Sequence, residues 1–420
     1  MNALLLALAL AAAPSKTAVS GPKFIEDDYA KALKAAKTGK KLLFVDAWAP
    51  WCHSCVAMKE QVFSRDSFKA FEKDVVFASI DTEKAKSSKF LDKYPVNVWP
   101  TLLFIDPTNE TVVLRWLGSA DESQMQALLT AAKATSGATR DADLAFGSNA
   151  SEAAEKYEAA LKAGTPDARL LLSALGALSM AKKADVCART VIEQLPALTL
   201  PQDRAVALGY GVWCALEMPE GRERGLALDQ LVPAAQKSLD APVLPDDVSG
   251  LYEALVEERD QAKDLIGTKT LATKWLTYLD GEAAKATTPA GRAVFDAHRT
   301  SAALKSGQPE KMVEPLTLSE KEIPGDYNPP ARLALIYREL GKLDDASAAI
   351  ERALKKCKEG PRKLRLFETK ASIQKKQGDS VAASKTLIEA LGYAKKLPRS
   401  QISAQRLAAL AEQLPAEAAK

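Results

Sequence analysis

The pattern of apolar residues changes along this chain, and the change divides it into two parts. Before residue 134, nearly unbroken apolar runs predict buried strands at 42–48, 75–81, 102–106 and 111–117. Helical spacing in the same part predicts helices at 24–38, 56–71 and 123–133. From residue 144 onward the strand signal disappears, and helical segments alternate with short turns that contain Gly, Pro or Asp. The pattern therefore predicts an α/β domain, followed by an all-α region.

The helical half carries an internal repeat near its end. Gly341 and Gly378 are 378 − 341 = 37 residues apart, and Ala346 and Ala383 have the same spacing. The clearest repeats lie at 329–360 and 363–397, and their pattern resembles tetratricopeptide (TPR) repeats. Small residues at such positions let paired helices approach closely. We expect a solenoid of TPR-like helical hairpins.

The strand predicted at 42–48 runs directly into two cysteines that open the next predicted helix. Cys52 is placed at or just before the helix N-terminus, where backbone N–H groups and the helix dipole stabilise a thiolate. Cys55 follows one turn later, close enough to form a disulfide with Cys52. We expect an exposed Cys52 to attack disulfides and a buried Cys55 to resolve the resulting mixed disulfide.

This segment resembles the active-site strand and turn of the thioredoxin superfamily. The resemblance rests on the motif VDAWAPWCHSC, which includes Asp46, and on Trp99-Pro100-Thr101 with the strand after it; it covers residues 23–133. Within the superfamily, this stretch looks most like the C-terminal domain of DsbD-type periplasmic reductases. The resemblance implies a thioredoxin fold, with a central mixed sheet flanked by helices. It implies no cofactor beyond the redox-active Cys52–Cys55 disulfide.

The same resemblance implies roles for residues around the dithiol. Asp46 is the buried acid that relays a proton for Cys55, and burial of such a carboxylate is expected to raise its pKa. Pro100 is expected to follow a cis peptide bond, and substrate backbone is expected to pair beside Trp99; simple core packing is the alternative for both. Trp51 and His53 are assigned to the substrate-binding surface, and His53 is expected to tune the stability of the thiolate.

The sequence divides into four expected segments. Residues 1–20 resemble a secretory signal peptide, with an apolar core at 3–13 that is too short to span a bilayer and no Lys or Arg before it. Residues 22–135 are the predicted thioredoxin-like domain, 136–145 the linker and 146–415 the helical repeats. We therefore expect a periplasmic or secreted protein without a transmembrane segment in the mature chain.

Charge and cysteine usage narrow the possible partners. The net charge of +3 over 420 residues gives no indication of a nucleic-acid partner. With two histidines, His53 and His298, and no second C-x-x-C motif, no metal site is predicted. Cys187 and Cys214 are expected either to pair or to remain buried free thiols, with free thiols favoured. Cys357 is expected to be a free thiol near the surface.

Two classes of function fit these features. The favoured one is an exported thiol–disulfide oxidoreductase that acts on protein thiols or disulfides, exchanges electrons with an upstream thiol partner, and binds a protein on its helical repeats. The alternative is a TPR scaffold in which the thioredoxin-like part is a binding module with incidental redox activity. Residues 355–399 hold thirteen Lys or Arg and four Asp or Glu, a balance of +9. This stretch is either a solvated face of the solenoid or a surface for an acidic partner.

Overall fold

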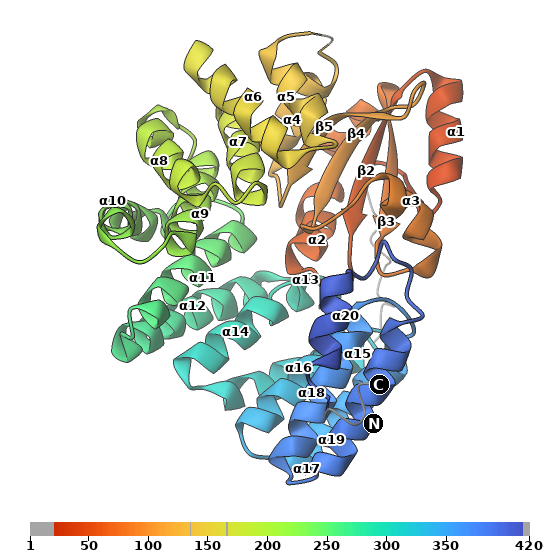
Figure 1. The fold of residues 1–420 in the computed structure, drawn as a ribbon, viewed down its shortest axis with the longest axis vertical. Helices are drawn as coiled ribbons and strands as arrows, with labels where there is room; N and C mark the ends of the chain where they lie inside the picture. Colours follow the sequence, from red (N-terminus) through yellow and green to blue (C-terminus); the bar gives the residue numbers. More distant parts are fainter. Residues whose placement is uncertain (1–20, 135, 165–166, 415–420) are drawn as a thin grey trace, which may run out of the picture.

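The computed structural model describes residues 21–134, 136–164 and 167–414. A five-stranded sheet with its helices occupies one side of the molecule, and the remaining helices curve away from it and return (Figure 1). The predicted signal peptide at 1–20 lies outside the described residues. No helix in the described part of the chain is long and apolar enough to cross a membrane.

The sheet is mixed, as the resemblance implied. Its strands are β1 (Phe24–Glu26), β2 (Leu42–Trp48), β3 (Val75–Asp81), β4 (Thr101–Asp106) and β5 (Thr111–Leu117), in the spatial order β1-β3-β2-β4-β5. β1, β3 and β2 are parallel, and β4 and β5 are antiparallel to their neighbours. Leu43 and Val45 pack in one core cluster and Phe44 in another. The apolar run of β2 is unbroken because both faces of the strand are buried.

Helices cover both faces of this sheet. They are α1 (Tyr29–Gly39), α2 (His53–Ala57), α3 (Ser88–Lys93) and α4 (Glu122–Ala132), with a π-helical turn at Met58–Phe63 and 3-10 turns at Asp66–Lys73 and Ala85–Ser87.

Two predicted helices differ from the observed ones. The helix expected at 24–38 begins at Tyr29, because Phe24 packs against the rings of Phe44, Phe63 and Phe77 and its segment joins the sheet as β1. The helix expected at 56–71 is interrupted after the π-helical turn. Phe63 and Phe68 are both buried, although side chains five positions apart point about 140° apart on a regular α-helix. The break allows both rings to enter the core.

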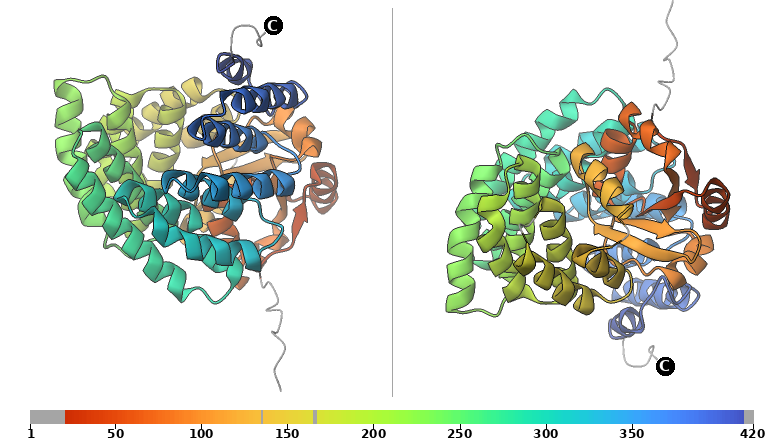
Figure 2. Two further views of the ribbon diagram at one scale, coloured as in Figure 1. Left: turned by 90° about the horizontal axis from the view of Figure 1, so that it is seen from below. Right: turned by 90° about the horizontal axis from the view of Figure 1, so that it is seen from above.

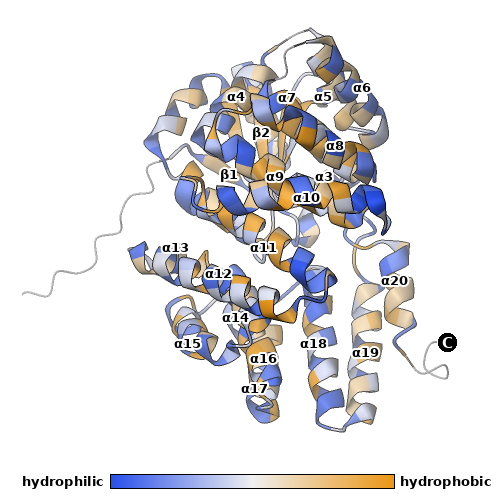
Figure 3. Ribbon diagram, turned by 90° about the vertical axis from the view of Figure 1, so that its left-hand side faces the viewer, coloured by the Kyte–Doolittle hydropathy of each residue, from blue (hydrophilic) through white to orange (hydrophobic). Residues whose placement is uncertain are grey.

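The rest of the chain is helical, as predicted. Its helices are α5 (Ala138–Phe146), α6 (Ala150–Ala163), α7 (Ala168–Met180), α8 (Ala184–Gln194), α9 (Pro201–Glu217), α10 (Arg222–Ser238), α11 (Pro245–Gln261), α12 (Leu265–Lys285), α13 (Pro289–Ala293), α14 (Asp296–Ser306), α15 (Val313–Glu322), α16 (Asn328–Glu339), α17 (Leu343–Lys356), α18 (Arg362–Lys376), α19 (Ser380–Ala394) and α20 (Ala404–Ala411), with 3-10 turns at Leu195–Ala197 and Pro309–Met312. The two predicted repeats contain the hairpins α16–α17 and α18–α19. Most helices carry both hydrophobic and hydrophilic residues (Figure 3), as helices that bury one face do.

The segment predicted as a linker, 136–145, is mostly helix α5. This helix packs directly on β5, and Gly147 at its end lies against Val112. One hydrophobic core runs from the sheet through Phe146 into Leu171 and Leu175 of α7. The interpretation of residues 136–145 as a spacer was therefore wrong, because apolar residues at 142, 145 and 146 bury α5 against the sheet.

The helical region closes back on the α/β domain. The Gln401 side chain donates hydrogen bonds to the carbonyl oxygens of Thr82 (2.8 Å) and Lys84 (3.0 Å), more than 300 residues away in sequence. The Ser400 hydroxyl donates to the Ser88 carbonyl at 3.2 Å. Figure 2 shows the curve from two further sides, with the last helices beside the sheet in both.

The structure also shows which of the remaining cysteines form a disulfide. Cys187 in α8 and Cys214 in α9 form a disulfide with a Cα–Cα distance of 5.9 Å, so the favoured expectation of free thiols was wrong. Cys357 is a free thiol, as predicted. It is only 2% exposed, so its placement near the surface was wrong: the end of α17 packs inward, within the hydrophobic core of the helical region.

Candidate active site

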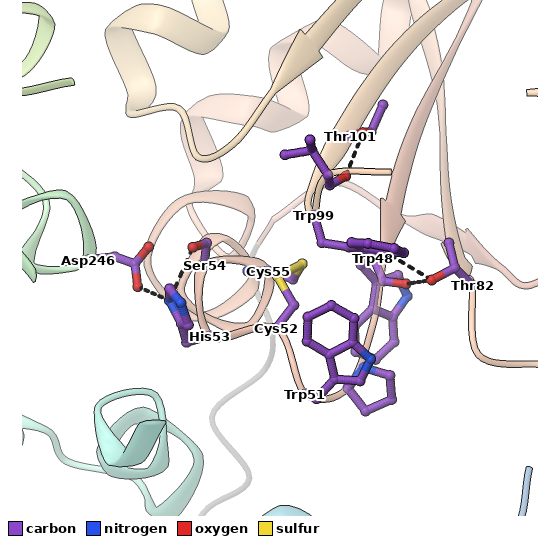
Figure 4. Close-up of a disulfide and its surroundings, with 12 residues drawn as sticks. Trp48, Trp51, Cys52, His53, Ser54, Cys55, Thr82, Trp99, Thr101 and Asp246 are labelled. Carbon is purple, nitrogen blue, oxygen red and sulfur yellow. Dashed lines mark hydrogen bonds and ion pairs between the residues drawn. A yellow bond between two sulfur atoms is a disulfide. The ribbon is translucent and has the colours of Figure 1, made fainter. Parts of the chain in front are cut away.

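Cys52 and Cys55 lie at the start of α2, directly after β2 (Figure 4). They form a disulfide with a Cα–Cα distance of 5.2 Å. Cys52 is the N-cap residue of α2, and its Sγ accepts a hydrogen bond from the Cys55 backbone N–H at 3.0 Å. The same contact would stabilise a Cys52 thiolate after reduction, because an N–H donor favours the charged form.

The expected exposure of Cys52 is wrong. Cys52 is only 4% exposed and Cys55 is fully buried. Both sulfur-bearing side chains cluster with Trp48, Trp51 and Trp99, and the rings of Trp51 and Trp99 meet at a centroid distance of 5.1 Å. A partner disulfide must therefore enter a lined recess to reach Cys52.

Asp46 lies in β2, two residues before the strand ends at Trp48, and is fully buried, as predicted. Neither of its carboxyl oxygens makes a hydrogen bond to a described residue. Burial raises the pKa of Asp46 to about 7, although the positive charge of Lys59 acts in the opposite direction. A carboxyl group with this pKa can hold or release a proton near neutral pH, which a proton relay to Cys55 requires.

Trp99 and Pro100 lie on the loop before β4. The Trp99–Pro100 peptide bond is cis, as predicted. The Trp99 indole N–H donates to the Thr82 hydroxyl at 2.8 Å, and the Thr101 hydroxyl donates to the Val98 carbonyl at 2.7 Å. These bonds fix the loop beside the dithiol, where a substrate strand is expected to pair.

The helical region holds the active-site turn at two points on one side. The Asn328 amide of α16 donates to the Pro50 carbonyl at 3.0 Å. The carboxylate of Glu83 accepts the Trp51 indole N–H at 2.7 Å and the Arg362 backbone N–H at 2.8 Å, and so connects the turn to α18. The Arg362 guanidinium also lies 5.1 Å from the Trp51 ring centre. Burial raises the pKa of Glu83 to about 7, while these hydrogen bonds act to lower it.

On the other side, His53 contacts an acid from α11. His53 Nδ1 lies 2.7 Å from Asp246 Oδ1, and His298 Nε2 of α14 lies 3.2 Å from the same oxygen. Burial, the largest single influence, acts to lower the pKa of His53, but the charge and hydrogen bond of Asp246 and the charge of Glu253 together raise that pKa above its ordinary value. Burial would raise the pKa of Asp246, yet the two imidazoles hold it well below its ordinary value.

A cavity of about 380 Å³ opens onto Cys52 between the two parts of the protein. Its wall includes Trp48 and His53 from the α/β domain and Tyr327 and Arg332 from the helical region. The indole N–H of Trp48 and the hydroxyl of Tyr327 are buried and make no hydrogen bond to any described residue. Both residues line the recess that a substrate must enter, but their unpaired donor atoms lie behind its surface.

The structure places Trp51, Cys52 and His53 in the wall of this recess, and Cys55 and Trp99 cluster with Cys52 behind it. Asp46 lies in β2 and Pro100 on the loop before β4, outside the wall, and residues that were not predicted join the site. Glu83, Asp246, His298, Asn328 and Arg362 come from positions up to 310 residues beyond Cys52, and no motif or spacing connects them to it. One sequence signal was present: the chain has only two histidines, and both lie at this site.

Comparisons with known proteins agree with this geometry. A family model described as a thioredoxin-like domain matches residues 29–133. Residues 29–133 are a thioredoxin-like domain.

Two relatives are similar to parts of the chain. "Protein disulfide-isomerase 1" of Dictyostelium discoideum is 31% identical over 85 residues, which are 20% of this chain and 23% of that protein. "Thiol:disulfide interchange protein DsbD 2" of Pseudomonas aeruginosa is 34% identical over 80 residues, 19% of this chain and 14% of that protein. The chain therefore spans less than a quarter of either relative.

Solved structures resemble the helical region only loosely. A tetratricopeptide repeat protein from Parabacteroides merdae is 13% identical with a TM-score of 0.42, covering 65% of this chain and 97% of that one. Yeast Tom70 is 13% identical with a TM-score of 0.31, covering 70% of this chain and 65% of that one.

The buried charge of Asp46 predicts a pH-dependent stability difference for Asp46→Asn. Between about pH 4 and pH 7 the folded protein keeps the Asp46 proton and the unfolded chain loses it, so wild-type stability falls as pH rises through this window. At pH 8 the free energy of unfolding of the variant should exceed that of the wild type by up to about 4 kcal/mol, at 1.36 kcal/mol per pKa unit. Near pH 4 the two free energies should differ little. Urea unfolding at both pH values measures this. Exposed Asp92→Asn is the control, and a pH-independent difference for Asp46→Asn would contradict the assignment.

Gly360 provides a test of how the helical region encloses the dithiol. It has φ +94°, and a Cβ there would lie 2.2 Å from the Glu83 Oε2 atom and 2.7 Å from the Glu83 carbonyl oxygen. Gly360→Ala should displace Glu83, release Trp51, and increase the alkylation rate of reduced Cys52 several-fold.

Gly378→Ala is the matched control. Gly378 has a similar φ of +85°, but open space surrounds the position of its Cβ. The backbone strain is therefore comparable, and no active-site contact is lost. Equal alkylation rates in the two variants, measured by mass spectrometry after an iodoacetamide pulse, would show that the Glu83 contact does not limit access to Cys52.

Proposed function

We propose that this protein is an exported thiol–disulfide oxidoreductase that acts on protein clients, and that its helical region forms half of the client-binding site. The observation that carries this proposal is the recess above Cys52, whose walls come from both parts of the chain. A simple scaffold does not require its dithiol to lie at a cavity that both parts of the chain enclose.

The proposed reaction is a two-electron exchange. The Cys52 thiolate attacks one sulfur of a client disulfide, the client S–S bond breaks, and the other client sulfur leaves as a thiolate. Cys55 then transfers its proton to Asp46 and attacks the Cys52 sulfur, which releases the second client thiolate. The client is reduced and the Cys52–Cys55 disulfide forms. An upstream thiol partner must reduce this disulfide again, and the same steps in reverse oxidise a client dithiol.

Client backbone would bind along the rim of the recess. The loop with Trp99 and Pro100 is free to pair with an extended segment as an added strand. Trp48 and Tyr327 line the recess, and a turn of either ring on client binding would let its buried, unpaired donor reach a client carbonyl oxygen. One of these donors belongs to the thioredoxin-like domain and the other to the helical region.

A second, larger groove of about 730 Å³ favours clients with acidic segments. It borders Trp51 and Trp99 and continues along the last helices, where its wall carries Arg362, Arg365, Arg399 and Arg406. Glu368 pairs with two of these arginines, at 3.9 Å from Arg365 and 2.7 Å from Arg406, while Glu83 and Asp92 also line the groove. The arginines still outnumber the acids, so part of the basic stretch 355–399 faces this groove.

The second disulfide supports export. Cys187 and Cys214 pair within the helical region, away from the active site. Structural disulfides persist mainly in oxidising compartments, such as the periplasm or the cell exterior. This pairing and the apolar N-terminus favour the same location.

Trapping of clients tests this proposal. Cys55→Ser should accumulate mixed disulfides through Cys52, because the resolving thiol is absent. Adding Arg365→Glu and Arg399→Glu should reduce trapping of acidic clients several-fold, whereas reaction with the small neutral compound 2-hydroxyethyl disulfide should change little. Both arginines are exposed in the groove wall.

The control carries the same charge change elsewhere on the basic stretch. Lys375→Glu and Lys385→Glu are exposed and do not line the groove. If both pairs of substitutions reduce the trapping of the same clients equally, the overall charge of the protein, and not the groove, selects those clients. If Cys55→Ser traps no protein through Cys52, the oxidoreductase proposal itself is wrong.

A further inference from the structure

The two histidines of this chain meet at one buried carboxylate. His53 comes from α2, Asp246 from α11 and His298 from α14, and the two contacts span 193 and 52 residues of sequence. The two imidazole rings lie 3.9 Å apart between their centres. Figure 4 shows His53 on the turn after Cys52, pointing away from the disulfide toward Asp246.

We propose that His53, Asp246 and His298 bind one divalent transition-metal ion of the Zn²⁺ class, joining the thioredoxin-like domain to the helical region. Two imidazole nitrogens and one carboxylate oxygen are a ligand set that Zn²⁺ accepts, usually with a further position left for water or another ligand.

The distances between the donor atoms suit such an ion. Asp246 Oδ1 lies 2.7 Å from His53 Nδ1 and 3.2 Å from His298 Nε2, and the three ligand atoms lie within 4.8 Å of one another. In a tetrahedral site, bonds of about 2.0–2.2 Å to Zn²⁺ place neighbouring ligand atoms roughly 3.3–3.6 Å apart. Small side-chain movements therefore bring the three atoms around an ion.

The surroundings also favour a cation. Glu253, further along α11, adds a second negative charge that acts on both histidines. A metal ion would take the place of the protons through which the two imidazoles contact Asp246. The positive charge of Arg332 acts against a cation near His53. The Trp275 ring lies 5.5 Å from the His298 ring and is itself buried, which holds His298 in place.

The site has an open side. The side chains of Asp246 and His298 are 6% and 5% exposed, whereas His53 is 35% exposed and borders the cavity above Cys52. A metal could enter from this cavity, and water could complete its coordination there. Because the chain has only two histidines, the sequence predicted no metal site. The fold brings both histidines together in one cluster.

Zn²⁺ binding to the oxidised, full-length protein tests the proposal. Oxidation closes Cys52–Cys55 and Cys187–Cys214, so these four cysteines cannot bind the metal, and the free Cys357 is buried. Isothermal titration with Zn²⁺ should show one site, and saturating Zn²⁺ should raise the thermal midpoint, because a ligand that binds only the folded state stabilises it. Co²⁺ should give a visible absorption spectrum at the same stoichiometry.

Matched variants assign the ligands. Asp246→Asn and His298→Gln should weaken Zn²⁺ binding by at least roughly tenfold, the loss seen when even an outer-shell partner of a metal ligand is removed. Asp247→Asn is the control: Asp247 is the next residue, and its hydrogen bonds go to Ser119 and Gln202. It should bind Zn²⁺ as the wild type does.

Two results would overturn the proposal. The first is an oxidised wild type that takes up no Zn²⁺ or Co²⁺, which needs no variant to interpret. The second is equal uptake by wild type, Asp246→Asn and His298→Gln, with each variant shown to be folded by circular dichroism.

Discussion

Closure of the helical region on the active-site turn is the constraint on which the rest of this structure depends. The Glu83 carboxylate accepts N–H groups from both Trp51 and Arg362, and it fits there because Gly360 has no side chain to occupy its place. With Asn328 on the Pro50 carbonyl, this contact encloses Cys52 to 4% exposure. Asn328, Gly360 and Arg362 all lie outside the thioredoxin-like domain, so the contacts that they make with the active-site turn exist only in the full chain.

This closure changes what the dithiol can react with. Asp46 in β2 has a pKa of about 7, and the Cys55 N–H donates to Cys52 Sγ. Both features belong to the thioredoxin-like domain and depend on β2 and α2. Tyr327 and Arg332 of the helical region line the cavity on Cys52, and arginines of α18 and its neighbours line a second groove beside Trp51 and Trp99. The dithiol and much of the wall around it thus come from different parts of one chain.

The sequence predicts the local features of this arrangement well and the contacts between its parts poorly. The strand–turn–helix around Cys52, the buried Asp46 and the cis bond before Pro100 follow from apolar runs and a motif confined to residues 42–101. The burial of Cys52 does not, because it depends on side chains some 280 residues further along. The linker prediction failed for the same reason: the stretch 134–143, rich in small and polar residues, indicated a break, but Ala142 and Phe146 have a sheet to pack on.

Reduction of the two disulfides in the folded, full-length protein tests the central claim most directly. The protein is equilibrated with glutathione buffers of graded potential, and the free thiols are then alkylated and assigned by mass spectrometry. If the enclosed dithiol is redox-active, Cys52–Cys55 should be reduced in one reversible two-electron transition, while Cys187–Cys214 stays oxidised and serves as an internal control. A Cys52–Cys55 bond that resists reduction until the protein unfolds, or that is reduced together with Cys187–Cys214, would contradict it.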